Sequence, residues 1–152
     1  MMTESGGIVG IGYEGRSVEA LIAELHGLEV SVLVDVRLNA ISRKRGLSKR
    51  GLEAALRDAG ISYLHRPQLG NPQDNRAGFA EPWHTDAGRT ARDRYVAHSI
   101  DTDAGAAAID ELVEVSRTKR IALLCFESSE LHCHRREVLA AARARLEALQ
   151  PA

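Results

Sequence analysis

The sequence predicts an α/β fold: a three-layer sandwich in which helices cover both faces of a mostly parallel, Rossmann-like sheet. Short apolar runs alternate along the chain with segments whose apolar residues recur at helical spacing. Two of these runs, residues 30–36 and 121–126, are apolar almost throughout, as strands covered on both faces are. A length of 152 residues fits one α/β domain spanning 1–152.

The elements are expected in a fixed order along the chain. Strands are expected at residues 8–11, 30–36, 61–64 and 121–126, the third ending near His65. Helices are expected after Ser17, after Ser48, from Thr90, at about 103–116 and at about 132–149. Serine and threonine favour N-cap positions, Leu47 and Leu52 are spaced as a hydrophobic staple around Ser48, and Gly60 is expected to end the second helix.

The segment 66–90 interrupts this alternation. It holds three of the four prolines together with several glycines. We expect a long Pro/Gly-rich loop here, because connections of this length without secondary structure are uncommon and form lids or lack order.

Composition and charge restrict the class of protein. The 20 Lys and Arg residues nearly balance the 21 Asp and Glu residues, which argues against a chain coated by nucleic acid and leaves a local basic patch open. Two cysteines are too few for a secreted disulfide framework. No apolar run approaches a membrane span, and the N-terminus has no signal-peptide pattern, so we expect a cytoplasmic protein without a membrane partner.

A glycine pattern follows the first strand. Gly10, Gly12 and Gly15 spell G-x-G-x-x-G, with Asp35 at the end of the second strand, which taken literally is a dinucleotide fingerprint. We reject this interpretation, because Gly10 comes so early that it lies inside the strand rather than in its turn. A glycine-tolerant turn explains the pattern, and backbone N–H groups near Gly15 and Arg16 remain candidates to hold an anion at a helix N-terminus.

Asp35 and Arg37 close the second strand. Alternation sends both side chains to the same side, so either they form an ion pair that ties the following loop down, or Asp35 orients Arg37 to hold a phosphate or carboxylate.

A basic segment follows at residues 37–57. It contains one acid, Glu53, and seven basic residues: Arg37, Arg43, Lys44, Arg45, Lys49, Arg50 and Arg57. This asymmetry predicts a partner that bears phosphate, such as a nucleotide, RNA or DNA. The alternative is a solvated basic face, and the segment has no aromatic residue for base stacking.

The last strand and the last helix bring together residue types that carry chemistry. Cys133 stands in the first turn of the expected helix beside His134 and Arg135, a setting that lowers a thiol pKa. Such a thiolate is a candidate nucleophile, with His134 or His65 as proton carrier and Glu127 as acid or orienting group.

Other interpretations of the cysteines remain open. Cys125 and Cys133 together with neighbouring histidines are suitable metal ligands, although their spacing fits no standard zinc motif. The two cysteines are also a candidate redox pair, and Cys125 alone is typical of a small apolar residue in a strand.

Several of these residues occur in motifs that resemble domain-of-unknown-function family 488, a set of small bacterial and archaeal proteins. The motifs are Ile11-Gly12-Tyr13-Glu14-Gly15-Arg16, Asp35-Val36-Arg37 with Ser42-Arg43, Gly60-Ile61-Ser62-Tyr63-Leu64-His65, Leu69-Gly70-Asn71, Leu123-Leu124-Cys125-Phe126-Glu127 and Cys133-His134-Arg135. The resemblance implies a three-layer α/β fold and no established reaction, so it leaves any cofactor unknown.

The polar residues singled out above follow strands, and ligands of parallel sheets bind beyond the carboxyl ends of the strands. The leading hypothesis is an enzyme-like cleft for a phosphorylated or nucleotide-like ligand, in which Asp35, Arg37, His65, Cys125, Glu127, Cys133, His134 and Arg135 share one site. The ligand-binding candidates are Gly12, Tyr13, Gly15, Arg16, Asp35, Arg37, Arg43 and Arg135. The alternatives are a non-catalytic nucleic-acid-binding module that uses the basic loop 43–50, and a metal or redox site.

Overall fold

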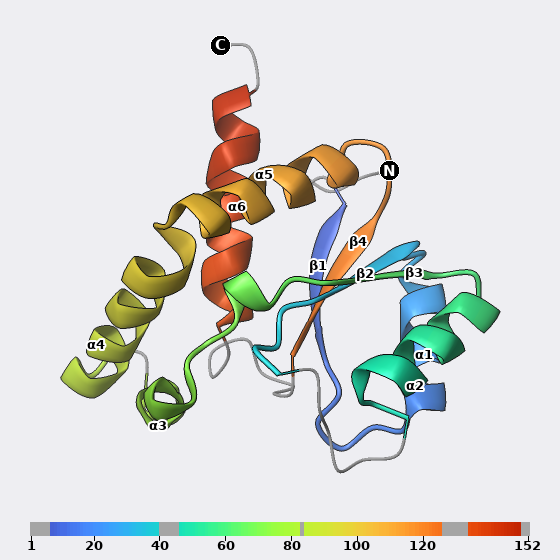
Figure 1. Ribbon diagram of the computed structural model, residues 1–152, viewed down its shortest axis with the longest axis horizontal. Coiled ribbons are helices and arrows are strands. Elements are labelled where there is room, and N and C mark those ends of the chain that lie inside the picture. Colours follow the sequence, from blue (N-terminus) through green and yellow to red (C-terminus); the bar gives the residue numbers. More distant parts are fainter. Residues whose placement is uncertain (1–6, 40–45, 83, 126–133, 150–152) are drawn as a thin grey trace.

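A parallel four-stranded sheet forms the centre of the protein (Figure 1). The computed structural model describes residues 7–39, 46–82, 84–125 and 134–149. The strands are β1 (Ile8–Gly12), β2 (Val32–Asp35), β3 (Ser62–His65) and β4 (Ile121–Cys125), in the spatial order β1-β4-β2-β3. Every pairing is parallel, so the carboxyl ends lie at one edge of the sheet, where Gly12 pairs with Cys125 and Asp35 with His65.

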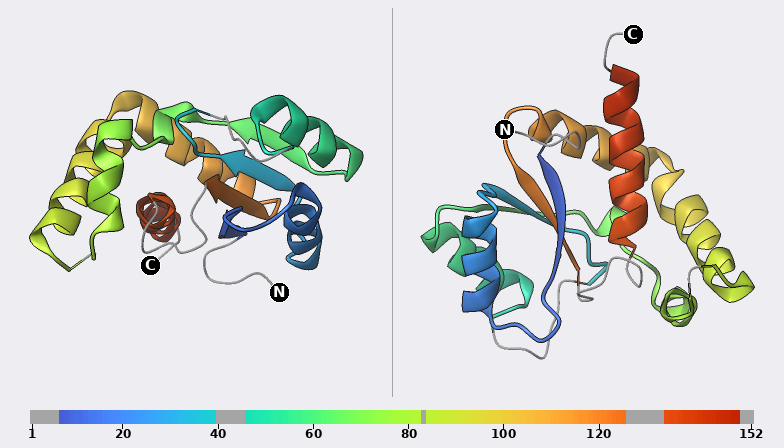
Figure 2. Two further views of the ribbon diagram at one scale, coloured as in Figure 1. Left: turned by 90° about the horizontal axis from the view of Figure 1, so that it is seen from below. Right: turned by 180° about the vertical axis from the view of Figure 1, so that it is seen from behind.

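Helices cover both faces of this sheet, which confirms the predicted α/β fold (Figure 2). They are α1 (Val18–Gly27), α2 (Lys49–Asp58), α3 (Arg76–Ala80), α4 (Asp86–Tyr95), α5 (Asp103–Ser116) and α6 (Arg135–Leu149). Shorter turns are η1 (Pro67–Leu69), η2 (Gln73–Asn75) and the π-helical η3 (Val96–Ile100).

Two apolar cores follow from the alternation of side chains along the strands. Leucines of α1 and α2, such as Leu21 and Leu52, pack with Leu33 on one face. Ile109 of α5 and Leu139 of α6 pack on the other face with the valines of β2, Ile8 of β1 and Ile121 of β4. Nearly all side chains of β2 and β4 are buried, as their apolar sequences predict.

The chain order explains which helix lies on which face. The connections from β1 to β2 and from β2 to β3 run in one direction, and their helices α1 and α2 lie on the same face. The connection from β3 back to β4 runs in the opposite direction, so a crossover of the same hand puts α5 on the other face. The neighbours β2 and β4 are therefore followed by helices on opposite faces, α2 and α6, and their carboxyl ends form a topological switch point.

Local sequence signals set several helix ends as predicted. Ser17 caps α1 by accepting a hydrogen bond from the Ala20 amide at 3.1 Å. Ser48 occupies the N-cap position of α2, and the staple residues Leu47 and Leu52 are both fully buried. Gly60 follows α2 with a φ of 80°, a left-handed conformation that glycine adopts without strain.

The prediction of a long loop at residues 66–90 was wrong. The segment contains η1, η2 and α3, and α4 begins at Asp86 with Thr85 as its N-cap rather than at Thr90. Tertiary packing explains the difference, because Phe79 is buried with α4 and α6 in the core. Gly78, which would mark a turn, instead lets α3 approach α4, since a Cβ there would lie 2.4 Å from the Cβ of Ala91.

Candidate functional site at the carboxyl edge of the sheet

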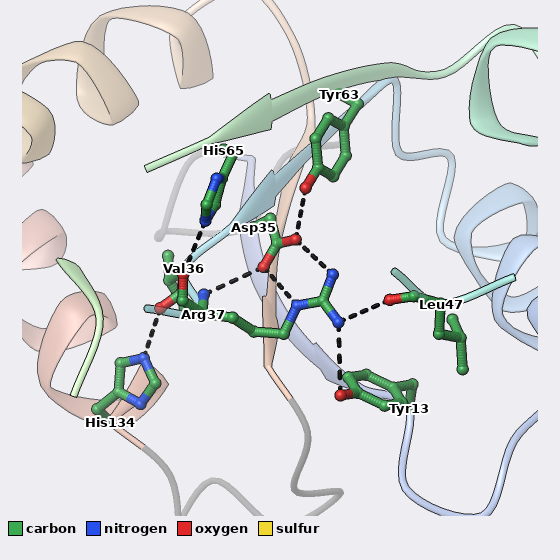
Figure 3. Close-up of polar contacts among 8 residues, drawn as sticks. All are labelled: Tyr13, Asp35, Val36, Arg37, Leu47, Tyr63, His65 and His134. Carbon is green, nitrogen blue, oxygen red and sulfur yellow. Dashed lines mark hydrogen bonds and ion pairs between the residues drawn. The ribbon is translucent and has the colours of Figure 1, made fainter. Parts of the chain in front are cut away.

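A buried ion pair joins Asp35 and Arg37 at the end of β2 (Figure 3). Arg37 donates from Nε to Asp35 Oδ1 at 2.8 Å and from Nη2 to Oδ2 at 2.6 Å, a bidentate geometry. The backbone amide of Arg37 donates to the same Oδ1 at 3.1 Å. The two side chains lie on the same side of the chain, as alternation along the strand predicts.

Two tyrosines and a backbone carbonyl complete this pair. Tyr63 of β3 donates its hydroxyl hydrogen to Asp35 Oδ2 at 2.6 Å, so the carboxylate accepts four hydrogen bonds. Arg37 Nη1 donates to the carbonyl of Leu47 at 2.7 Å and, more weakly, to the Tyr13 hydroxyl at 3.4 Å. The Arg37 guanidinium also lies over the Tyr13 ring, 5.3 Å from its centroid.

Burial and the ion pair fix the protonation of these groups. Burial, reinforced by the hydrogen bond to Asp35, raises the pKa of the Tyr63 phenol far above its ordinary value. Burial opposes the charge of Arg37, but Asp35 outweighs it and raises the pKa of the guanidinium. Tyr63 is therefore a permanent donor and Arg37 a permanent cation, and neither is suited to carry protons near neutral pH.

Arg37 joins the two ends of the segment 38–46. Its backbone follows β2, while its side chain holds the carbonyl of Leu47, just before α2. Four of its five N–H donors are used on Asp35, Tyr13 and Leu47. The structure thus contains the ion pair that was one of the two alternatives drawn from the sequence, and the role of Arg37 in holding an anion stays a prediction.

Two histidines hold neighbouring carbonyls beyond the end of β2. His65, the last residue of β3, contacts the carbonyl oxygen of Arg37 through Nε2 at 2.8 Å. His134, just before α6, contacts the carbonyl oxygen of Val36 through Nε2 at 2.8 Å. A carbonyl oxygen only accepts, so each ring carries its hydrogen on Nε2.

The carboxyl end of β3 is also tied to α5. Arg66 donates to both carboxylate oxygens of Glu111, at 2.6 and 2.7 Å, and to the carbonyl of His65 at 2.8 Å. The hydrogen bonds from Arg66 lower the pKa of the Glu111 carboxyl. This ion pair holds β3, and with it His65, against α5.

The lowered pKa of Glu111 predicts how the contribution of this residue to stability changes with pH. Its ionised form is favoured in the folded state, so its contribution is present above the ordinary glutamate pKa of 4.5 and is lost as the pH falls through the lower folded value. The carboxylate side chain is 39% exposed, so Glu111→Gln should lower the free energy of unfolding at neutral pH by only about 0.5 kcal/mol. Urea denaturation should show the difference at neutral pH and its loss once the pH falls below the lowered pKa of Glu111 in the folded state; a difference that persists in strong acid would contradict the assignment.

Arg135 is buried in the first turn of α6. Its side chain is 1% exposed, the lowest value among the charged residues of this helix, and it follows His134 in the chain. Nearby, Arg92 of α4 pairs with Glu137 at 2.9 Å, and the ring of Tyr95 lies 5.2 Å from that of His134. Burial raises the pKa of the Glu137 carboxyl, although Arg92 opposes this shift.

A family model spans most of the chain that builds this site. The model described as domain of unknown function DUF488 matches residues 17–142. The chain belongs to the DUF488 family. Its description assigns no activity to the members, and searches of the curated proteins and of the solved structures found no match to this DUF488 protein.

The candidate residues of this DUF488 protein fall into three groups. Asp35, Arg37, His65 and His134 form one network with Tyr13, as Figure 3 shows. Cys125 ends β4 at the same edge and is buried and disulfide-bonded, and Arg135 follows His134. The remaining candidates Arg43, Lys44, Arg45, Glu127 and Cys133 lie outside the described residues, so their roles stay predictions.

The turn after β1 does not offer all the amides expected of it. Gly10 and Gly12 lie within β1 itself, as the argument against a dinucleotide fingerprint required. Gly15 has a φ of 74° and makes the turn, but the Arg16 amide donates to the Tyr13 carbonyl at 2.9 Å. That hydrogen bond removes the Arg16 amide as an anion ligand, and the Arg16 side chain pairs with Glu24 of α1.

The described part of the DUF488 chain contains neither a metal-site cluster nor a membrane-spanning helix. No group of three or more His, Cys, Asp or Glu side chains converges there as a metal site requires. None of the helices in those ranges combines the length and the apolar character of a membrane span.

Sequence reasoning missed the residues that hold the Leu69-Gly70-Asn71 segment in place. Tyr95 donates its hydroxyl hydrogen to the Leu69 carbonyl at 2.6 Å, and Ser99 donates to the Gly70 carbonyl at 3.0 Å. Asn75 donates to the side-chain oxygen of Asn71 at 2.9 Å. These bonds explain what the Leu69-Gly70-Asn71 motif does, and no periodicity or spacing in the sequence indicates them.

Proposed function

We propose that the carboxyl edge of the sheet is an enzyme-like cleft that binds a small phosphorylated or nucleotide-like ligand, with Arg135 as its principal cation. The observation that carries this proposal is the burial of Arg135 in the first turn of α6, at the point where β2 and β4 are followed by helices on opposite faces. Ligands of open α/β sheets bind at such switch points.

The charge distribution around Arg135 supports an anionic ligand. A helix N-terminus carries a partial positive charge, so a cation there is opposed by the helix dipole while an anion is favoured. Arg136 follows in the same turn and Arg92 approaches from α4, while Glu137 is the acid that these two arginines share. The helix N-terminus and the positive charge of these arginines both favour an anion such as phosphate.

Histidine and cysteine side chains are the groups that would carry out chemistry in such a cleft. His65 has its hydrogen on Nε2, and its other ring nitrogen is suited to exchange a proton with a ligand. A redox pair of Cys125 and Cys133 remains part of the proposal, in keeping with the disulfide-bonded Cys125. Cys133 as a nucleophile, with Glu127 as its acid, also remains part of it, and this role requires the cysteines to be reduced first.

Removing the charge of Arg135 tests the proposal. With adenosine monophosphate as the probe, Arg135→Gln should weaken binding measured by calorimetry at least about tenfold, because hydrogen bonds to charged groups contribute about 1.5–3 kcal/mol. Arg135→Lys, which keeps the charge, should retain part of the affinity. Arg143→Gln removes the same charge from an exposed position of α6 and should change nothing.

Thermal unfolding of each variant separates lost binding from lost folding. Failure of the natural protein to bind adenosine monophosphate or inorganic phosphate would overturn the proposal, as would an Arg135→Gln variant that is folded and binds unchanged.

Nucleic-acid binding is the second candidate, and the exposure of Lys49, Arg50 and Arg57 on α2 favours it. Calorimetry on the same variants, with single-stranded RNA in place of adenosine monophosphate, distinguishes this candidate from the anion cleft. Single-stranded RNA would bind with an affinity that falls steeply with salt, and Arg135→Gln would leave that affinity intact.

A further inference from the structure

His65 presents a hydrogen-bond acceptor at the carboxyl edge of the sheet. Its Nε2 must donate to the carbonyl of Arg37, because that oxygen has no hydrogen to give. In the neutral ring the other nitrogen, Nδ1, then carries a lone pair and no hydrogen. The contact with the Arg37 carbonyl thus leaves Nδ1 as the ring nitrogen of His65 that can accept a hydrogen bond.

This acceptor is still unused within the part of the chain that the structure describes. His65 makes no interaction there through Nδ1, and its side chain is half-buried, so solvent reaches it. The charged and titratable groups around it are engaged with one another. Asp35 binds Arg37 and Tyr63, while Arg66 binds Glu111 and the His65 carbonyl.

His65 and His134 lie at the same strand end, and His134 directly precedes Arg135, the cation of the proposed cleft. His65 holds the carbonyl of Arg37 and His134 holds that of Val36, so both rings are fixed at successive peptide units (Figure 3). If the proposed function holds, a ligand bound by Arg135 at this edge of the sheet lies where His65 offers its acceptor.

We infer that the ligand of this cleft is an anion that also donates a hydrogen bond, such as hydrogen phosphate or a phosphorylated compound with a neighbouring hydroxyl group, and that His65 Nδ1 accepts that bond. The inference rests on the proposed function and adds a rule of selection. An anion without a hydrogen, such as sulfate, places its oxygen lone pairs against the lone pair of Nδ1 and leaves that acceptor unsatisfied.

Phosphate and sulfate provide a matched pair of probes. At about pH 8 an ordinary imidazole is neutral, and hydrogen phosphate and sulfate carry the same charge and differ by one hydrogen. The natural protein should bind phosphate about tenfold more tightly than sulfate, the effect of one hydrogen bond to a charged ligand. Calorimetric titration of each ion, and its competition with adenosine monophosphate, measure this ratio.

Two variants assign the preference to His65. His65→Trp keeps a ring N–H donor for the Arg37 carbonyl and has no acceptor, and His65→Phe keeps a ring without either nitrogen. In both, the affinity for phosphate should fall to that for sulfate, while the affinity for sulfate stays within about twofold. If only one of the two variants folds, it alone decides the result.

The outcomes separate this inference from the proposed function. Equal binding of the two ions, both displaced by adenosine monophosphate, would overturn the role of His65 and leave the cleft standing. No binding of either ion or of adenosine monophosphate would overturn both. Long-range proton–nitrogen spectra give an independent decision, because a neutral His65 ring with its hydrogen on Nδ1 would overturn the assignment without any ligand.

Discussion

Asp35→Asn is expected to lower the free energy of unfolding by about 3–5 kcal/mol, because it leaves the buried guanidinium of Arg37 without its counter-charge. The asparagine has nearly the same shape, so the loss reports charge and hydrogen bonding rather than a cavity. Tyr63→Phe removes only one of the four hydrogen bonds to Asp35, and should lower the free energy of unfolding by about 1.5–3 kcal/mol, the range for a hydrogen bond to a charged group. Urea denaturation measures both.

An exposed ion pair in the same protein provides the control. Asp86 pairs with Arg89 at 2.6 Å, but the Asp86 side chain is 96% exposed. Asp86→Asn should therefore change the free energy of unfolding by less than about 0.5 kcal/mol. If Asp35→Asn had an equally small effect, the network at the end of β2 would not be the buried anchor described above.

Gly105→Ala is expected to lower the free energy of unfolding by at least about 3 kcal/mol. Gly105 lies in the first turn of α5, and a Cβ there would meet the backbone oxygen of Ser99 at 1.7 Å and that of Ile100 at 2.9 Å. Backbone of η3 would have to move to make room. The better helix propensity of alanine, worth about 1 kcal/mol, is too small to offset this clash.

Gly27→Ala provides the matched control. Gly27 ends α1, and a Cβ there would have no heavy atom within 4 Å. This variant should be unchanged or stabilised by up to about 1 kcal/mol, through the reduced freedom of the unfolded chain. Thermal unfolding of the two variants side by side should show opposite or clearly unequal shifts; similar shifts would mean that α5 does not pack against η3 as described.

The fold class could be predicted because its signals are local. Strands such as 121–125 are apolar at every position, and Ser17 and Gly60 mark helix ends through chemistry within a few residues. The segment 66–90 could not be predicted in the same way. Its prolines and glycines favour a loop, and helices form there because Phe79 and Tyr95 are buried against other elements.

The candidate site, like the fold, could be predicted from the sequence only in part. The sequence placed Asp35, Arg37 and His65 at strand ends, and the parallel order of the strands was enough to gather them at one edge. It left open whether Arg37 was paired or available to a ligand. That choice depends on Tyr13 and Leu47, which approach from other parts of the chain.

By itself, then, the sequence determined the alternation of strands and helices, the buried faces and the edge at which polar residues collect. Only the tertiary structure decided the hydrogen-bond partners: that Arg37 uses four donors within the protein, and that His65 keeps Nδ1 as its acceptor within the described chain. Periodicity is a property of neighbouring residues and can be read along the chain. A hydrogen bond depends on which distant atoms the folded backbone brings within about 3 Å, and the sequence pattern does not contain that distance.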